Sequence, residues 1–380
     1  MIIYIFVLFI LSYFIIRYDV MQKTSGYTFS YLFILLNFIL IAGLRYKIGS
    51  DTLVYMEEYI EYPSLFDLAR YDILWVLFCA ICKTISKSFF FMQFVQALII
   101  NCIYFYFIYK NTNYRFTALF LYFIFGFLYF NTEIMRESLA VAIFLLSLHS
   151  FYKKKWIRYF LLVIIASLFH SSALITLFFP LVHRIKISNF FFYSILILTL
   201  LSNVLWKLFN ESIHYFFILS SSIESKASAY LDNDAFIYNF NGILLGIIIY
   251  VLLPLIFVFL AKKYEQTNIK ESPFLWLYIL FGIFVVFNNT IFMRFQNYLF
   301  FPFIIFLSNF FFESKKSLKY IFLRKTKIAI LLLSLFIGRH YNYFKPDITE
   351  TTYIYNRYFP YHSIITKKTT TERELLDYYW

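Results

Sequence analysis

The stretch that decides the fold runs from Phe89 to Tyr109 and reads FFFMQFVQALIINCIYFYFIY. It contains no charged side chain, and its length matches the roughly twenty mostly apolar residues that an α-helix needs to cross a bilayer. Similar apolar runs recur along the chain. Because backbone polar groups find no water in lipid, we expect each run to be helical.

Composition extends this conclusion to the whole chain. The 380 residues are 62% hydrophobic and 14% charged, with a mean hydropathy of +0.71, whereas soluble domains carry about a quarter charged residues. These values exclude a water-soluble fold and intrinsic disorder. The sequence predicts an all-α polytopic integral membrane protein with about 11–12 transmembrane or re-entrant helices and short loops. The predicted segments are Ile2–Ile16, Thr28–Leu44, Ile73–Ser86, Phe89–Tyr109, Phe116–Phe130, Met135–Tyr152, Trp156–Val182, Phe190–Trp206, Ile243–Ala261, Phe274–Phe287, Phe295–Phe312 and Ile328–Gly338.

The basic residues indicate orientation. The net charge is +13, which in a soluble protein would suggest nucleic acid, but the clusters at 153–158, 183–186, 262–270 and 315–327 adjoin apolar runs, as cytoplasmic anchors do. We therefore expect no nucleic-acid partner. The sequence predicts one membrane domain over residues 1–380, with larger external loops at about 45–72 and 210–241. The tail at about 339–380 is predicted to be external as well.

Two segments complicate this topology. The run from Trp156 to Val182 is too long for one helix, and a break near His170 that folds the chain back would keep the basic residues after it inside. The parity of residues 73–115 stays open. Cys79 and Cys82 form a CxxC without a second pair or histidine partners, so we expect them to pack in the core.

The first candidate site follows the second helix. Two glycines bracket Arg45 and Lys47, and Asp51 belongs to a Ser-Asp-Thr stretch typical of a helix start, with Tyr55 one turn further. An arginine beside a helix N-terminus favours phosphate. The alternative is an ordinary capped interfacial helix whose arginine extends to the membrane surface.

Two further candidate sites contain carboxylates. Asp72 precedes the third segment, where it is either a general base or an acid favoured by the helix dipole. Arg136 is flanked by Glu133 and Glu137, and on one helix these three charges would share a face. That arrangement suits either a ligand site or a salt bridge.

The last two candidate sites lie at junctions. His170 stands at the predicted break, ahead of two serines able to cap the next half-helix, although a lone histidine is often a packed core group. Arg294 and Gln296 lie in a polar junction without a nearby acid in sequence. Under one topology all five places face the non-cytoplasmic side, which predicts a single external pocket.

The sequence lacks several catalytic motifs. It has no P-loop, no HExxH, no GxSxG and no DxD between soluble strands, so we expect neither metal nor cofactor. Arginines with carboxylates and a histidine suit a substrate that already carries a pyrophosphate leaving group, because guanidinium charge stabilises that group.

The order of these elements resembles the EpsG-type membrane proteins of exopolysaccharide and capsule gene clusters, which are akin to O-antigen polymerases. Two positions depart from the family pattern, since Asp72 stands where Glu is usual and Glu137 where Gln is usual. A carboxylate at 137 allows a pair with Arg136. The resemblance rests on Arg45 with Gly49-Ser50-Asp51-Thr52 and Tyr55, the acid at 72, Arg136-x-x-x-Ala140, the Lys153 run, Phe169-His170-Ser171-Ser172-Ala173-Leu174, Arg294 to Tyr298, and Tyr358-Phe359-Pro360-Tyr361-His362-Ser363.

The resemblance implies a glycosyltransferase, a polymerase that joins undecaprenyl-pyrophosphate-linked oligosaccharide repeat units at the outer, periplasmic face of the bacterial inner membrane. A chain-length regulator and a flippase are the implied protein partners. Arg45, Arg136 and Arg294 would bind pyrophosphate, aided by Tyr55, Glu137 and Gln296. Asp72 would be the general base, with Asp51 and His170 behind it. The alternatives are a membrane transferase of single sugars and a lipid-linked oligosaccharide flippase, although the matching halves expected of a transporter are not evident.

Overall fold

The computed structural model describes residues 2–49, 51–61, 72–217, 240–263, 271–285, 287–312, 347–348, 354–355 and 358–366. The predicted all-α class is confirmed, because the only strands in these ranges are the two-residue β1 (Asp347–Ile348) and β2 (Ile354–Tyr355). Contacts group the chain into two compact units. Unit 1 comprises Met1–Leu174 with Phe322–Trp380, and unit 2 comprises Ile175–Ile321.

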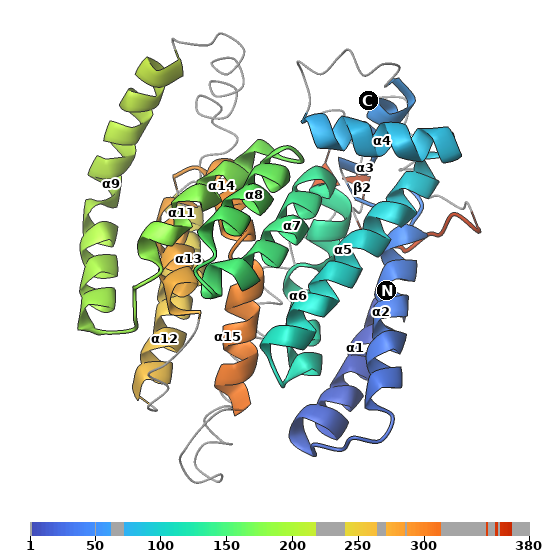
Figure 1. Ribbon diagram of the computed structural model, residues 1–380, viewed down its shortest axis with the longest axis horizontal. Helices are drawn as coiled ribbons and strands as arrows, with labels where there is room; N and C mark the ends of the chain where they lie inside the picture. The colour runs from blue at the N-terminus through green and yellow to red at the C-terminus, as the bar shows by residue number, and fades with distance from the viewer. Residues whose placement is uncertain are drawn as a thin grey trace. The chain divides into compact units, whose positions relative to one another are not determined.

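Unit 1 begins with a helical hairpin. Helix α1 (Ile2–Phe14) continues into a π-helical turn, η1 (Ile15–Val20), and the chain then reverses into α2 (Tyr27–Gly43), as Figure 1 shows. Helix α5 (Phe89–Asn111) packs against α2. The chain continues through the bundle as α6 (Arg115–Phe125), η2 (Tyr129–Glu133), α7 (Met135–Tyr152) and α8 (Trp156–Ser167).

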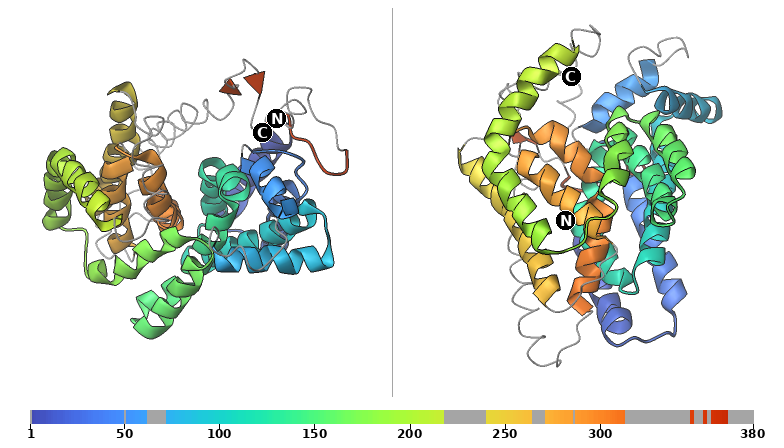
Figure 2. Two further views of the ribbon diagram at one scale, coloured as in Figure 1. Left: turned by 90° about the horizontal axis from the view of Figure 1, so that it is seen from above. Right: turned by 60° about the vertical axis from the view of Figure 1, so that its left-hand side comes forward.

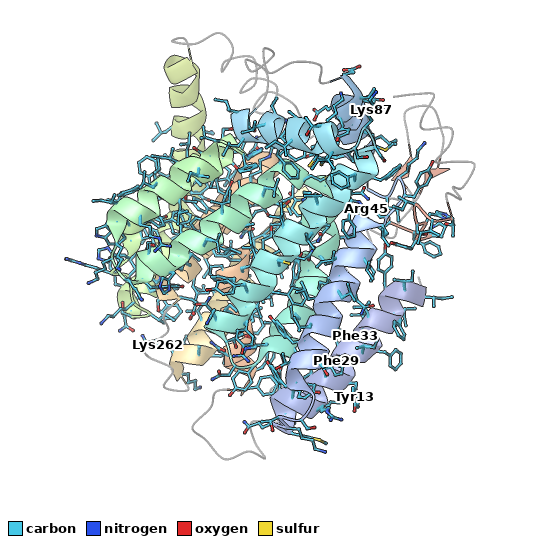
Figure 3. All side chains as sticks on the ribbon, turned by 45° about the vertical axis from the view of Figure 1, so that its right-hand side comes forward. Tyr13, Phe29, Phe33, Arg45, Lys87 and Lys262 are labelled. Carbon is cyan, nitrogen blue, oxygen red and sulfur yellow. The ribbon has the colours of Figure 1, made fainter. Side chains whose placement is uncertain are left out.

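Helix α2 shows which apolar side chains are buried in the bundle and which are exposed. Ile34 and Phe38 are buried against the bundle, whereas Phe29 and Phe33 are exposed and point outward in Figure 3. In water such exposure would be costly, but a lipid-facing surface is expected to be apolar. The bundle therefore has a packed interior and an apolar exterior.

Two further helices lie at the end of unit 1 where α2 finishes. Helix α3 (Asp51–Glu61) is the more polar one, and α4 (Ile73–Ile85) lies across the end of the bundle in Figures 1 and 2. Arg45 is at this end, and Tyr13 is at the opposite end (Figure 3). The predicted external loop at 45–72 thus contains an ordered helix.

Unit 2 is also helical. Helix α13 (Ser272–Val285) packs against α9 (Asn189–Phe217) and α14 (Asn289–Asn297). The other elements are α11 (Phe240–Gly246), η5 (Ile247–Leu252), α12 (Leu253–Lys263) and α15 (Phe300–Phe312). The 3-10 helix η3 (Ser171–Val182) begins at the end of unit 1 and continues into unit 2.

The helices of the structure match the predicted transmembrane segments in part. Within the described ranges, four helices are long and apolar enough to cross a membrane, or five if α14 and α15, bent by 56°, form one span. Six shorter apolar helices account for other predicted segments. The predicted break near His170 is confirmed, since α8 ends at Ser167 and η3 begins at Ser171. Helix α9 extends to Phe217, past the predicted loop start at 210, and the predicted segment Ile328–Gly338 lies outside the described residues.

Candidate functional site

Arg45 follows the end of α2 and is almost fully buried, with 1% of its surface exposed. Its Nη1 donates to the carbonyl oxygen of Ala42 at 2.5 Å and its Nη2 to Sδ of Met135 at 3.4 Å. Its Nε has no hydrogen-bond partner among the described residues. Burial lowers the pKa of Arg45 to about 10, so the guanidinium still carries its charge at neutral pH.

Two backbone attachments hold the Arg45 turn. Nε2 of Gln93 on α5 donates to the carbonyl oxygens of Gly43 and Arg45, at 2.8 and 2.9 Å. The segment 358–366 adds a short antiparallel pairing, in which Arg45 bridges Ser363. In that pairing the N–H of Tyr46 donates to His362 O and the N–H of Ile364 donates to Leu44 O, both at 2.9 Å.

Gly49 lets the chain turn into α3. Its φ of +100° suits glycine, and a Cβ there would lie 2.7 Å from Cβ of Thr132. This close approach places the start of α3 beside η2. The backbone N–H of Asp51 donates to Oε2 of Glu133 at 3.3 Å. The predicted helix N-terminus is thus present, and a carboxylate of the same chain is bound there; the Asp51 side chain itself is exposed.

Glu133 is the centre of this cluster. Its Oε1 accepts a hydrogen bond from the hydroxyl of Tyr358 at 2.6 Å and one from Oγ1 of Thr132 at 3.4 Å. It also interacts electrostatically with Arg45. The expected continuous helix through Glu133 and Arg136 is wrong, because η2 ends at Glu133 and Ile134 has non-helical φ and ψ of −116° and 50°.

Arg136 lies in the first turn of α7 and faces other partners. Its guanidinium is hydrogen-bonded to the side chain of Tyr55 and lies 5.7 Å from the centre of that ring. It interacts electrostatically with Glu58 and Asp72. The structure therefore brings together Tyr55, Asp72 and Arg136, three of the predicted site residues, and adds Glu58. The predicted residue Glu137 is buried on the same helical turn as Arg136.

Asp72 precedes α4, as predicted. Its backbone carbonyl accepts from the N–H groups of Trp75 and Val76, but its side chain makes no capping hydrogen bond. The dipole interpretation needs no such bond and stays open; the structure adds an electrostatic interaction between Asp72 and Arg136. Burial raises the pKa of Tyr55 to about 12, so this hydroxyl stays protonated at neutral pH and is a hydrogen-bond donor.

His170 lies in the turn between α8 and η3. Its Nδ1 accepts the backbone N–H of Ser172 at 3.3 Å and contacts Oγ of Ser172 at 2.7 Å. A backbone N–H can only donate, so Nδ1 is the acceptor and the neutral ring carries its proton on Nε2. His170 thus supplies the cap that was expected from the serines. The same turn lies beside the start of α4, since Leu74 N donates to Leu168 O at 2.9 Å.

Arg294 and Gln296 belong to α14 in unit 2. Nε2 of Gln296 donates to the carbonyl oxygen of Tyr278 at 3.0 Å, and Asn288 caps the helix by accepting from the N–H of Ile291. Their place in a common site with the unit 1 residues stays a prediction. Within the described ranges, no group of three or more His, Cys, Asp or Glu side chains is placed to hold a metal ion.

Sequence reasoning missed Glu58 and Tyr358. Helical spacing on α3 would have placed Glu58 near Tyr55, because residues three apart share a face. No local pattern pairs Tyr358 with Glu133. In chemical terms, the end of unit 1 offers two buried or half-buried guanidinium groups, a helix N-terminus and carboxylates from α3, η2 and the start of α4. These are the groups that anion binding and proton acceptance require.

Comparison with known proteins gives one family. The model of the EpsG family matches residues 27–363, which include every element of unit 1 described above except α1, η1 and the last residues of the segment 358–366. No curated protein matches the chain, and no solved structure matches it.

Proposed function

The chain belongs to the EpsG family, and from this membership and the arginine–carboxylate cluster of unit 1 we propose that it is a polysaccharide polymerase. Its substrates are oligosaccharide repeat units linked to undecaprenyl pyrophosphate, which it joins into O-antigen, capsule or exopolysaccharide. It is a multi-pass protein of the bacterial inner membrane with its site toward the periplasm. A flippase supplies the repeat units and a chain-length regulator works beside it.

The reaction is a glycosyl transfer. A hydroxyl oxygen of the acceptor unit attacks the anomeric carbon of the donor glycan, and the bond from that carbon to the pyrophosphate oxygen breaks. Asp72 accepts the hydroxyl proton, and undecaprenyl pyrophosphate leaves with the bonding electron pair. Arg45 and Arg136 stabilise the charge on the leaving group, as does Arg294 once substrate is bound.

The other side chains have supporting roles. Tyr55 orients Arg136, and its hydroxyl donates a hydrogen bond to the substrate or to a backbone carbonyl, such as that of Glu133 at 3.4 Å. Glu137 and Gln296 contact the glycan. His170, through Nε2, donates a hydrogen bond to the substrate, and Asp51 is the second candidate for the base.

One observation carries this proposal. Tyr55 on α3, Asp72 at the start of α4 and Arg136 on α7 come from three separate elements; Arg136 is hydrogen-bonded to Tyr55 and interacts electrostatically with Asp72. A carboxylate near a guanidinium is suited to accept a proton next to a bound phosphate.

Lipid-linked intermediates of a deletion strain test the proposal. A polymerase defect leaves single repeat units accessible from outside the inner membrane. Units trapped inside would instead identify a flippase, and incomplete units a transferase of single sugars, and either result overturns the proposal. Complementation with Arg136→Ala is expected to give no polymer, whereas Arg158→Ala, which alters an exposed arginine on α8, serves as the matched control.

A further inference from the structure

The contacts of Glu133 describe a binding site for a phosphoryl group. We propose that the two donors to its carboxylate, the Tyr358 hydroxyl and the Asp51 N–H, together with the charge of the Arg45 guanidinium, bind a phosphoryl group of the substrate, and that Glu133 is a tethered anion which the ligand displaces. The identity of the ligand rests on the proposed function; the anion site itself rests on the contacts that follow.

The first argument is the arrangement of donors. The two oxygens of Glu133 accept from the Tyr358 hydroxyl at 2.6 Å and from the Asp51 N–H at 3.3 Å. The second donor belongs to the first turn of an eleven-residue helix, α3, whose dipole favours an anion at that end. A phosphoryl oxygen accepts hydrogen bonds from the same donors that a carboxylate oxygen uses.

The second argument is independent and concerns Arg45. Its two hydrogen bonds go to neutral acceptors, Ala42 O and Met135 Sδ, and its buried Nε has no partner in the part of the chain that the structure describes. Arg45 nevertheless interacts electrostatically with Glu133. A buried donor without an acceptor is costly. A phosphoryl group has one more terminal oxygen than a carboxylate and so can supply that acceptor while it replaces Glu133.

The third argument is that only the side chain of Glu133 has to move. The backbone of η2 is held by Asn131, whose Nδ2 donates to Phe127 O at 2.7 Å and whose Oδ1 accepts from Nδ2 of Asn101 at 2.8 Å. The hydroxyl of Tyr122 also contacts Asn131, at 3.0 Å. Rotation about the side-chain torsions of Glu133 therefore exposes the donors without rearranging η2.

Competition between the two anions gives a direct test. The full chain is purified in detergent and titrated with inorganic pyrophosphate by calorimetry. Glu133→Gln removes the competing charge at nearly constant shape, so we expect pyrophosphate to bind about tenfold more tightly than to the wild type, as expected for the loss of one nearby like charge. Glu57→Gln, which neutralises an exposed acid of α3, is the matched control and is expected to leave affinity unchanged.

Two further variants keep the test decisive. Glu133→Asp retains the charge but withdraws it from the donors, and it should bind with an affinity between the wild type and Glu133→Gln; it also serves if the Gln variant does not fold. Adding Tyr358→Phe to Glu133→Gln should lower the affinity again by about fivefold through loss of one hydrogen bond.

Equal affinity in the wild type and both Glu133 variants, or no pyrophosphate binding in any of them, would overturn the inference. Tighter binding together with repeat units trapped inside a deletion strain would leave the anion site standing and remove the polymerase.

Discussion

The hydroxyl of Tyr358 lies 2.6 Å from Oε1 of Glu133, although 225 residues separate the two in sequence. Because the acceptor is a carboxylate, we expect Tyr358→Phe to lower the free energy of unfolding by about 1.5–3 kcal/mol. Tyr361→Phe loses a bond to a neutral carbonyl, Ile41 O at 3.1 Å, and should cost only about 0.5–1.5 kcal/mol. Thermal unfolding of the two purified variants in one detergent checks this order, and equal losses would contradict it.

The turn at Gly49 is expected to tolerate no side chain. Gly49→Ala combines a φ of +100° with a Cβ only 2.7 Å from Thr132, so it should destabilise the protein by about 1–3 kcal/mol and stop polymer formation. Gly26 has a φ of +77° and lies in the α1–α2 turn. Gly26→Ala should therefore share the backbone strain but keep polymer formation. Polysaccharide blots normalised to protein level compare the two, and polymer from Gly49→Ala would refute the expectation.

The hydrogen bond from Ser172 N–H to Nδ1 of His170 predicts which substitution of His170 retains polymer formation. If Nε2–H is the functional donor, His170→Gln, whose amide nitrogen reaches about as far as Nε2, should retain some polymerisation. His170→Asn places its amide near Nδ1 and should retain none. Polymer length on gels, with protein level verified, distinguishes them. The reverse ranking would show that the role of His170 is confined to capping η3.

The raised pKa of Tyr55 predicts an alkaline transition. Because burial raises the pKa of the folded state from 10 to about 12, the stabilisation is complete below pH 10 and is lost as the pH rises from 10 to 12. The loss amounts to about 2–3 kcal/mol for a shift of this size. Unfolding temperatures measured from pH 9 to 12 should fall more steeply for the wild type than for Tyr55→Phe. Parallel curves would contradict this assignment, and the exposed Tyr13→Phe is the control.

Asp72 provides the test of the proposed base. Asp72→Asn keeps the size but cannot accept a proton at neutral pH, so we expect polymer formation to fall by about a hundredfold or more. Asp72→Glu, the residue usual in the family, should keep most of it. If Asp72→Asn retains activity, Asp72 is not the general base and Asp51 becomes the candidate.

The sequence predicted most of the helices because apolar runs of spanning length leave little choice in a bilayer. It also predicted the break at His170, where polar residues interrupt a run too long for one helix. It predicted the segment Met135–Tyr152, which is α7, but not the π-helical turn before it, because the residues of that turn up to Glu133 are of the types found at a helix start.

The candidate site was predicted in part for a physical reason. Arg136 and Asp72 stand at helix starts, and charges at apolar boundaries are visible in sequence; Tyr55 follows one turn after the helix-start stretch at Asp51. The partners of Glu133 are not visible in sequence, because Tyr358 and the N–H of Asp51 approach it only in the tertiary structure, which no sequence periodicity predicts. Where Arg294 and Gln296 of unit 2 lie with respect to these residues stays a prediction.

Because residues 358–366 attach to the Arg45 turn, the cluster around Glu133 is completed only late in translation. Arg45, Asp51 and Glu133 emerge from the ribosome early, but the Tyr358 hydroxyl that completes their cluster is translated after all of α1–α15. A nascent chain therefore carries an incomplete donor set while its helices are being inserted. The hydroxyl of Tyr4 then donates to the backbone carbonyl of Tyr358 at 3.1 Å, so α1 is joined to residues translated much later when the cluster is completed.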